Sequence, residues 1–309
     1  MTDQNALMVL VGPTAVGKTS ACVKLCRSFG AEVVGADSVQ IYRRLDIGSA
    51  KPTLAEQALA PHHMVDVVDP DEPFDAARYV EMADRVIADL HQRGRRALVA
   101  GGTGLYIKAL LHGLVPAPEV DPALRAELRR EWEDKGLDFM HGKLCRLDPG
   151  AGERIHKNDR QRVLRALEVC IQTGRPFSER QTGHGFQKDR YKHLMVGLIR
   201  PREELFQRIA ERSRLMWENG FVEEVRGLLD SGVPPDAKSL KTLGYRQVVA
   251  MLTGQIGSDE ALEQTIRDTR AYAKRQLTWF KGMKNIHWHA PDDLEAIADK
   301  ASEIWPIQV

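Results

Sequence analysis

Residues 12–19 are Gly12-Pro13-Thr14-Ala15-Val16-Gly17-Lys18-Thr19, and they match the pattern G-x-x-x-x-G-K-[ST] of a phosphate-binding loop. In such a loop the glycines let backbone N–H groups turn toward phosphate oxygens, and Lys18 adds a positive charge. The hydroxyl of Thr19 is a suitable ligand for Mg²⁺. We therefore expect this stretch to bind a diphosphate or polyphosphate, with Mg²⁺ at Thr19.

The segments around this loop predict an α/β fold. The apolar run 6–11 is typical of a buried strand, and residues 18–29 predict a helix whose N-terminus faces the anion. The pattern then predicts strands at 32–35, 64–68 and 97–100, and a helix at 75–93 with Asp75 near its N-cap. Strands separated by helical crossovers form a parallel sheet with helices on both faces, as in P-loop NTPase-like folds.

Three of these strands end in polar or glycine-rich groups: the phosphate-binding loop, Asp37-Ser38, and Gly101-Gly102-Thr103-Gly104. In open α/β sheets, ligands bind beyond the carboxyl ends of the strands. We therefore expect these three segments to converge on one cleft.

A helical segment interrupts the α/β pattern. Helices are predicted at about 122–135, 139–147 and 159–173, and no clear strand pattern occurs between 118 and 192. After it, the pattern predicts a strand at 194–199, helices at 203–219, 222–229, 243–252 and 258–280, a short strand near Ile286 and a terminal helix. We expect a core formed by residues 1–118 and 188–309, and a helical insertion domain at 119–187.

Composition is that of an ordinary globular protein: 309 residues, 43% hydrophobic and 28% charged. The sequence has no apolar run of membrane-spanning length and no basic signal-peptide start, so we expect a cytoplasmic location without membrane contact. Its four cysteines form no C-x-x-C pair, and we expect Cys22 and Cys26 to be buried. Residues 141–200 hold 13 Lys and Arg but only 6 Asp and Glu, which fits either a polyanion-binding surface or a solvated helical face.

The chemistry of the site is open at this level. The guanine-reading Asn-Lys-x-Asp is absent, and no strand end resembles an ATPase acidic motif. Instead a lone carboxylate, Asp37, follows the strand closest after the loop helix. It fits a general base beside the bound phosphates, or alternatively an N-cap or an indirect magnesium partner.

Several further blocks give the chain a resemblance to the bacterial tRNA dimethylallyltransferase (tRNA isopentenyltransferase) family. They include Asp37-Ser38-Val39-Gln40-Ile41-Tyr42, Asp46-Ile47-Gly48-Ser49-Ala50-Lys51-Pro52, His62-His63-Met64-Val65-Asp66, Gly101 to Tyr106, Asn158 to Arg162 with Arg165 to Glu168, Gly244-Tyr245, and Tyr272 to Gln276 with Thr278-Trp279-Phe280. The resemblance covers nearly the whole chain. The departures are Val16, where a serine is common, and Lys157, where a proline often stands.

The resemblance implies transfer of a dimethylallyl group from dimethylallyl diphosphate to the exocyclic amine of the tRNA adenosine 3′ of the anticodon. The phosphate-binding loop and Mg²⁺ then hold a leaving diphosphate, and Asp37 removes the proton of the amine. The implied catalytic residues are Asp37, Thr103, Lys18 and Arg212. One member of the pair Arg208 and Arg212 supports the diphosphate, although both also fit surface ion pairs.

The resemblance also implies an RNA-binding set that reads the anticodon stem-loop of tRNA. It consists of Asp37, Ser38, Val39, Gln40, Thr103, Arg125, Gln161, Arg162, Val163, Leu164, Arg165, Lys241, Thr242, Gly244, Tyr245, Arg246, Lys274 and Arg275. Trp279 and Phe280 fit either an RNA contact or the core. Two alternatives remain, a small-molecule kinase and a non-catalytic RNA-binding protein; nothing in the sequence demands more than a monomer.

Overall fold

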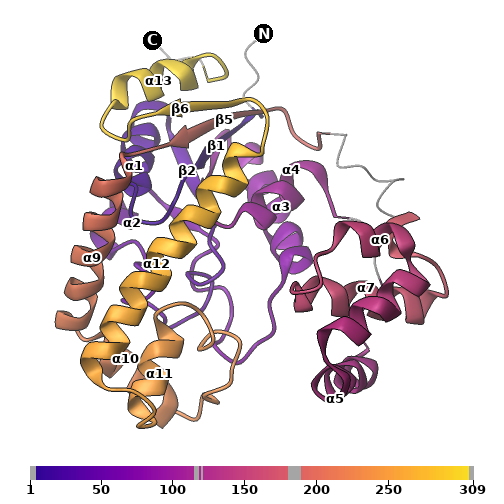
Figure 1. Cartoon of the computed structure of the whole chain (residues 1–309). Helices are drawn as coiled ribbons and strands as arrows, with labels where there is room; N and C mark the ends of the chain where they lie inside the picture. Colours follow the sequence, from indigo (N-terminus) through magenta and orange to yellow (C-terminus); the bar gives the residue numbers. More distant parts are fainter. Residues whose placement is uncertain (1–4, 115–117, 120, 180–188, 306–309) are drawn as a thin grey trace. The chain divides into compact units, whose positions relative to one another are not determined.

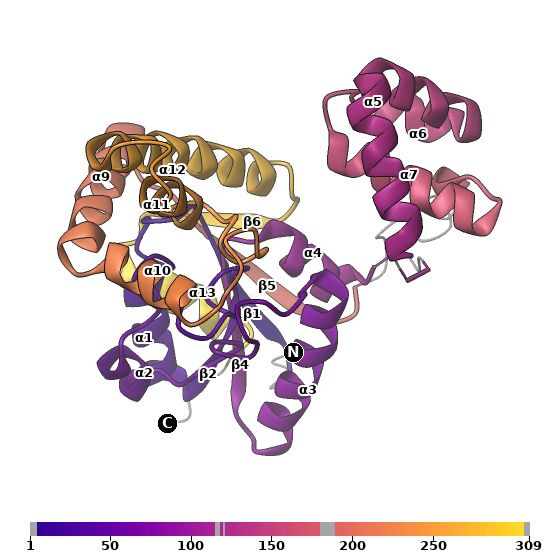
Figure 2. The same cartoon turned by 90° about the horizontal axis from the view of Figure 1, so that it is seen from below.

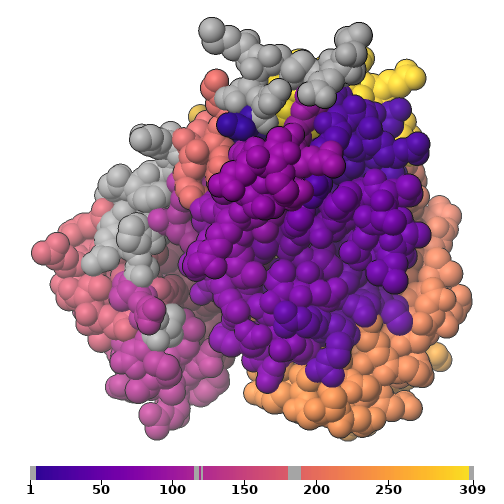
Figure 3. All heavy atoms as spheres, turned by 180° about the vertical axis from the view of Figure 1, so that it is seen from behind, coloured from indigo at the N-terminus to yellow at the C-terminus, as the bar shows by residue number. Residues whose placement is uncertain are grey.

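The computed structural model describes residues 5–114, 118–119, 121–179 and 189–305. The chain divides into two compact units. The core unit consists of Met1–Leu111 and Arg190–Val309, and the helical unit is His112–Asp189. The expected insertion, 119–187, lies within the helical unit, and the expected boundary at residue 188 lies outside the described residues. Figure 3 shows that segments from both ends of the chain, indigo to purple and orange to yellow, form one body in the core unit.

A six-stranded sheet forms the centre of the core unit (Figures 1 and 2). Its strand order is β3-β2-β4-β1-β5-β6. Every adjacent pair is parallel. The strands are β1 (Leu7–Val11), β2 (Ala31–Ala36), β3 (His62–His63), β4 (Arg96–Gly101), β5 (His193–Leu198) and β6 (Ile286–His289). The central strand β1 is buried along its whole length, as expected for a parallel sheet covered on both faces. This confirms the predicted fold class.

Helices cover both faces of this sheet. The core unit contains α1 (Lys18–Phe29), α2 (Leu54–Leu59), α3 (Ala76–Gln92), α4 (Gly104–His112, whose last residue opens the helical unit), α9 (Arg202–Glu218), α10 (Phe221–Asp230), α11 (Tyr245–Leu252), α12 (Ser258–Lys281) and α13 (Leu294–Ser302). Alternate residues of β1 point to opposite faces: Met8 and Leu10 pack with α1, α9 and α13, and Leu7 and Val9 pack with α3, α4, α10 and α11. Helix α12 contributes to both hydrophobic clusters, through Ala273 and Phe280.

The helical unit contains α5 (Pro122–Leu147), α6 (Pro149–Arg154) and α7 (Arg160–Thr173) (Figure 2). Its own small core is formed by Leu128, Met140, Leu144, Ala151, Val163, Leu164, Ala166 and Leu167. The two predicted helices at 122–135 and 139–147 form one element that is interrupted at Gly136, where φ is 76°. A left-handed residue breaks the helical backbone and is readily adopted by glycine.

The strand predicted at 64–68 is wrong. The sheet pairs at His62 and His63 instead, and Met64 and Asp66 have left-handed φ values of 63° and 55°. Left-handed residues do not belong to an extended strand, so this segment cannot continue β3. Further along it, Val68 makes an isolated bridge to Tyr42. The short helices α2, α4 and α6 were not predicted. Within the described residues, no helix is both long and apolar enough to cross a membrane.

Candidate active site

The phosphate-binding loop joins β1 to α1, as the sequence predicts. Gly17 immediately precedes α1 and has a φ of 112°, a backbone conformation that residues other than glycine rarely adopt. A Cβ at Gly12 would lie 2.9 Å from the carbonyl oxygen of Leu198 on the neighbouring strand, so glycine is also needed there for close packing. These two glycines allow the loop to pass close to the neighbouring strand and to lead into the N-terminus of α1. Backbone N–H groups at a helix N-terminus favour a bound anion.

Lys18 lies half-buried in the first turn of α1. Its Nζ donates to the carbonyl oxygens of Gly12 (3.0 Å) and Pro13 (2.9 Å), so the side chain bends back over its own loop. Burial lowers the pKa of Lys18 to about 8, against the opposing attraction of Asp37, and the neighbouring positive charge of Arg212 lowers it further. A bound anion would relieve this repulsion.

Asp37 follows β2 and lies at the same edge of the sheet. Its Oδ1 accepts backbone N–H groups of Val39 (2.8 Å) and Gln40 (3.3 Å), which fixes the carboxylate at the start of the 37–40 turn. The hydroxyl of Thr103 accepts the N–H of Ser38 at 3.1 Å and so joins the glycine loop after β4 to this turn. Asp37 therefore holds a local turn, as an N-cap would, and also faces the charges of Lys18 and Arg212.

Two arginines of α9 reach the phosphate-binding loop. Arg212 donates from Nη2 to the hydroxyl of Thr14 at 2.6 Å, and Arg208 donates from Nε to the carbonyl oxygen of Ala15 at 3.1 Å. Burial lowers the pKa of Arg212 to about 10, even though Asp37 acts to raise it. The surface-ion-pair interpretation is wrong for Arg212, because its guanidinium lies half-buried on the loop itself.

Two residues of α12 that the sequence analysis did not assign to the site support it. Gln276 is buried; its Oε1 accepts the N–H of Thr14 at 2.9 Å, and its Nε2 donates to the carbonyl oxygen of Gly102 at 2.9 Å. It thereby joins the loops after β1 and β4. Burial and then the charge of Asp37 raise the pKa of Tyr272 to about 12, and its hydroxyl hydrogen-bonds Thr103 and Gln276.

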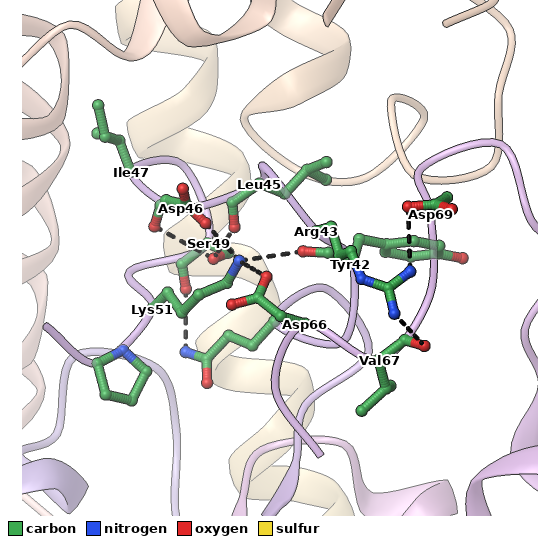
Figure 4. A network of polar contacts seen from close by, with 12 residues as sticks. Tyr42, Arg43, Leu45, Asp46, Ile47, Ser49, Lys51, Asp66, Val67 and Asp69 are labelled. Atoms are coloured by element: carbon green, nitrogen blue, oxygen red, sulfur yellow. Dashed lines mark hydrogen bonds and ion pairs between the residues drawn. The ribbon is translucent and has the colours of Figure 1, made fainter. Parts of the chain in front are cut away.

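A buried lysine stabilises the loop that follows the 37–40 turn (Figure 4). Lys51 donates to the carbonyl oxygen of Tyr42 at 3.0 Å and forms ion pairs with Asp46 and Asp66, the latter at 2.6 Å. Its side chain is only 5% exposed. The amide of Gln40 donates to the carbonyl oxygens of Ser49 (3.1 Å) and Ala50 (3.0 Å) on this loop. The side-chain amide nitrogen of Gln40 therefore anchors this loop to the 37–40 turn.

The same loop is held from the other side by Glu224 of α10. Its Oε2 accepts the backbone N–H groups of Asp46 (2.8 Å) and Ile47 (2.6 Å), and its Oε1 accepts that of Gly48 (3.2 Å) and the hydroxyl of Tyr245 (2.7 Å). The sequence does not predict this role of Glu224, because a single acidic residue on an amphipathic helix has no local signal.

A cavity of about 540 Å³ opens between these segments. Its walls include Thr14 to Ser20 of the loop and first turn, together with Asp37, Gln40, Lys51, Arg208, Arg212, Tyr272 and Gln276. Lys18, Asp37 and Arg212 thus line one space, as the convergence of strand ends predicts. Thr103 is bonded to Tyr272, which lines the cavity, and to the N–H of Ser38.

The donor set fits a magnesium ion bound together with phosphates. Thr19 lines the cavity in the first turn of α1. Within the described residues, no group of three or more His, Cys, Asp or Glu side chains could hold a metal by itself. Mg²⁺ commonly takes one or two protein ligands and completes its shell with substrate phosphates and water. Thr19 beside a phosphate cradle is compatible with that arrangement.

The structure corrects part of the expected RNA-binding set. Val163 and Tyr245 are fully buried and Leu164 is 8% exposed, so these three side chains are not available to RNA; Gly244 is buried against Phe221. They serve instead in the cores of the helical unit and the core unit. Phe280 likewise belongs to the core, whereas Trp279 is 37% exposed.

Other members of that set fall into two groups. Arg125 holds the buried Glu168 with two hydrogen bonds of 2.6 and 2.8 Å, and Arg165 contacts the same carboxylate at 3.2 Å, so both stabilise the helical unit. The remaining side chains lie exposed or half-exposed on the surface: Ser38, Val39, Gln161, Arg162, Lys241, Thr242, Arg246, Lys274 and Arg275. Cys22 and Cys26 are free and buried, as expected.

Known proteins resemble this chain along nearly its full length. A family model described as IPP transferase matches residues 40–283. Proteins named tRNA dimethylallyltransferase from Desulfatibacillum aliphaticivorans and Geobacter sulfurreducens are each 46% identical to it, over 98% of this chain and 99% and 98% of their own lengths.

Solved structures give the same relationship. The full-length tRNA isopentenylpyrophosphate transferase from Bacillus halodurans is 36% identical over 97% of both chains, with a TM-score of 0.70. A eukaryotic dimethylallyltransferase acting on tRNA is 28% identical over 96% of this chain and 77% of its own, with a TM-score of 0.78. The phosphate-binding loop precedes the residues that the family model matches, so the loop is independent support for the site.

Proposed function

Since the chain belongs to the IPP transferase family, we propose that it transfers a dimethylallyl group from dimethylallyl diphosphate to the exocyclic N6 amine of the tRNA adenosine 3′ of the anticodon. The chain is an enzyme that prenylates tRNA. One observation carries the more detailed proposal: a single cavity brings the cations Lys18 and Arg212 next to the carboxylate Asp37.

The cationic side of the cavity suits the diphosphate of the donor. The N–H groups at the start of α1, Lys18 and Arg212 form a cradle in which negative charge growing on the leaving group is stabilised. When the donor binds, Nζ of Lys18 exchanges its hydrogen bonds to the carbonyl oxygens of Gly12 and Pro13 for hydrogen bonds to the phosphates. Mg²⁺ held by Thr19 and the phosphates would neutralise part of that charge. Arg208, more exposed and bonded to Ala15, has the supporting role of holding the loop.

Asp37 suits the acceptor side. The hydrogen bonds that the neighbouring backbone makes to it go to Oδ1, and Asp37 lines the cavity, so we assign its other oxygen as the proton acceptor. The bond from nitrogen to the prenyl carbon forms while the bond from that carbon to the diphosphate oxygen breaks. Diphosphate leaves with the bonding electron pair, and the proton of the amine passes to Asp37. Thr103, fixed by Ser38, positions this turn.

The acceptor base lies in an RNA loop and must leave its stack to enter the cavity. Gln40 offers its Oε1 to the base, because its two amide N–H groups hold the 46–52 loop. The exposed residues Lys241, Arg246, Lys274 and Arg275 of the core unit suit phosphate contacts. All these groups come from one chain, so a monomer is sufficient. A tRNA substrate also implies a cytoplasmic location.

Mass spectrometry of an anticodon stem-loop tests the proposal. The hairpin is incubated with the protein, Mg²⁺ and dimethylallyl diphosphate, and we expect the mass of one C5H8 unit to be added at the adenosine 3′ of the anticodon. A hairpin with purine in place of that adenine lacks the amine and should remain unmodified. An unmodified adenosine hairpin, together with phosphate transfer from ATP to a small metabolite, would instead indicate a kinase.

A further inference from the structure

A second cavity, of about 370 Å³, lies within the helical unit. It is lined by Arg154, Ile155, Arg162, Arg165 and Phe177. This volume falls in the range of roughly 300–1,000 Å³ that small-molecule sites occupy. Three guanidinium groups around two apolar side chains are an unusual composition for a cavity that has no part in the chemistry of the core unit.

The arginines come from the facing ends of two helices. Arg154 is the last residue of α6 and donates from Nε to the carbonyl oxygen of Gly150 at 2.9 Å. Arg162 lies in the first turn of α7; it contacts Asp159 at 3.3 Å, and its side chain is 65% exposed. Arg165, one turn later, is directed by Glu168 and by the carbonyl oxygen of Pro118. Among the described residues, the contacts of Arg154 and Arg162 therefore use few of their guanidinium donors.

The aromatic wall is fixed in place by its neighbour Ser178. The N–H and hydroxyl of Ser178 donate to Asp148 at 2.7 and 2.5 Å, and the same carboxylate accepts the N–H of Ala151 at 2.9 Å. Although burial acts to raise it, these hydrogen bonds lower the pKa of Asp148 below its usual range. Phe177 is half-buried against the core of the helical unit, with one side left to the cavity. The wall is therefore preformed.

The charged side chains that line the cavity are arginines, and the carboxylates they contact are paired with them. Four arginines, Arg154, Arg162, Arg165 and the adjacent Arg125, meet the carboxylates Asp148, Asp159 and Glu168. Asp148 and Glu168 are buried and engaged by hydrogen bonds, so they do not repel an anion at the surface. A ligand that presents both a planar apolar face and a negative charge would match both walls.

We propose that this cavity binds one unpaired nucleotide of the tRNA substrate, with its base against Phe177 and Ile155 and its phosphate on Arg154 and Arg162. This inference rests on the proposed function, which supplies an RNA hairpin with an open loop as the ligand. Unpaired bases of RNA loops are commonly bound by stacking on aromatic or guanidinium planes. The site adds a base contact to a unit whose arginines otherwise suggest backbone contacts alone.

An abasic scan tests the site. Each loop nucleotide of the anticodon stem-loop is replaced in turn by an abasic one, and the affinity is measured by fluorescence anisotropy for the wild type and for Phe177→Leu. In the wild type we expect a loss of about ten-fold at one loop position. Phe177→Leu should lose about ten-fold on the intact hairpin and nothing further at that position. Leucine keeps the packing against the core, and a thermal melt reports whether the unit is intact.

Two further variants sharpen the result. Phe177→Trp keeps an aromatic face and should retain the wild-type pattern, whereas Arg129→Gln, an exposed arginine of α5 outside the cavity, should leave the abasic pattern unchanged. If Phe177→Leu still loses about ten-fold at the same abasic position as the wild type does, the site is absent. Prenyl transfer by the wild type is measured on the same intact hairpin. If the prenyl group is transferred but the effects of Phe177→Leu and of the abasic replacement are independent, only the nucleotide site is overturned. If the two effects are coupled but no prenyl group is transferred, only the proposed function is overturned.

Discussion

The catalytic cavity of the core unit and the arginine-lined cavity of the helical unit are built differently. In the core unit, Lys18 and Arg212 are half-buried, are anchored on the phosphate-binding loop, and have lowered pKa values of about 8 and 10. In the helical unit, the side chain of Arg162 is largely exposed and contacts Asp159, and Arg165 contacts the carboxylate of Glu168. Desolvated cations interact strongly with a charge that changes during a reaction, whereas exposed ones hold an anion without responding to chemistry. The first cavity is therefore suited to catalysis and the second to recognition.

The largest contrast should come from Asp37→Asn. The asparagine oxygen can still accept the N–H groups of Val39 and Gln40, so the turn is kept while the proton acceptor is lost. We expect kcat to fall on the order of 10²- to 10⁴-fold, with RNA affinity nearly unchanged. Single-turnover prenyl transfer at saturating hairpin measures the first quantity, and anisotropy the second. Loss of affinity with normal turnover would make Asp37 a recognition residue and remove the contrast.

A smaller effect is expected from the pH dependence of diphosphate binding. Burial lowers the pKa of Lys18 to about 8, so the free protein carries this charge below pH 8 and loses it as the pH rises through that value. Affinity for Mg-diphosphate should be level below pH 8 and decline above it. Arg212, with a pKa of about 10, keeps its charge across this window.

Lys18→Met is the matched control for that titration. It should weaken diphosphate binding about ten- to one-hundred-fold at pH 7, the range expected for losing a charged hydrogen-bond donor. It should also remove the decline above pH 8, while the titration of diphosphate itself is common to both proteins. Calorimetry at several pH values measures both. The same decline in the variant would assign the titration to a group other than Lys18.

Lys51, whose buried side chain supports the loop beside the catalytic cavity, should contribute to the stability of the core unit. Lys51→Met leaves Asp46 and Asp66 without their shared cation and frees the carbonyl oxygen of Tyr42. We expect the free energy of unfolding to fall by about 1–3 kcal/mol. Arg43→Gln, in the same network of Figure 4, removes an exposed ion pair with Asp69 and should cost less than about 1 kcal/mol. Urea denaturation compares the two variants, and equal losses would show that burial of Lys51 adds nothing.

The two cavities also differ in how far the sequence predicts them. The phosphate-binding loop is a local pattern in which each residue type has a local reason, so its strand, turn and helix were predicted to within a residue. Gln276 and Glu224 could not be found this way, because each acts on a loop far from it in the chain. Their roles depend on how α10 and α12 pack, which no local pattern encodes.

Helix α7 shows a different limit. The resemblance implied an RNA role for Val163 and Leu164, although their spacing with Leu167 is that of a helix face directed at a core. The predicted strand at 64–68 failed for the opposite reason: its residue types favour a strand, but left-handed Met64 and Asp66 turn the chain so that Asp66 can meet Lys51. In both places tertiary packing decides, and the residue types alone do not.

The smallest effect is expected at Arg162, whose exposed side chain we assign to a phosphate contact. Arg162→Gln should weaken hairpin binding only a few-fold at moderate salt and reduce the slope of log K against log[salt] by about one. Its kcat at saturating hairpin should stay unchanged, because the residue touches no reacting group. Arg165→Gln is the informative partner, since it also exposes the buried Glu168 and should lower the stability of the helical unit. If Arg162→Gln left the salt slope unchanged, the helical unit would lose its electrostatic role in recognition, and both cationic functions would belong to the core unit.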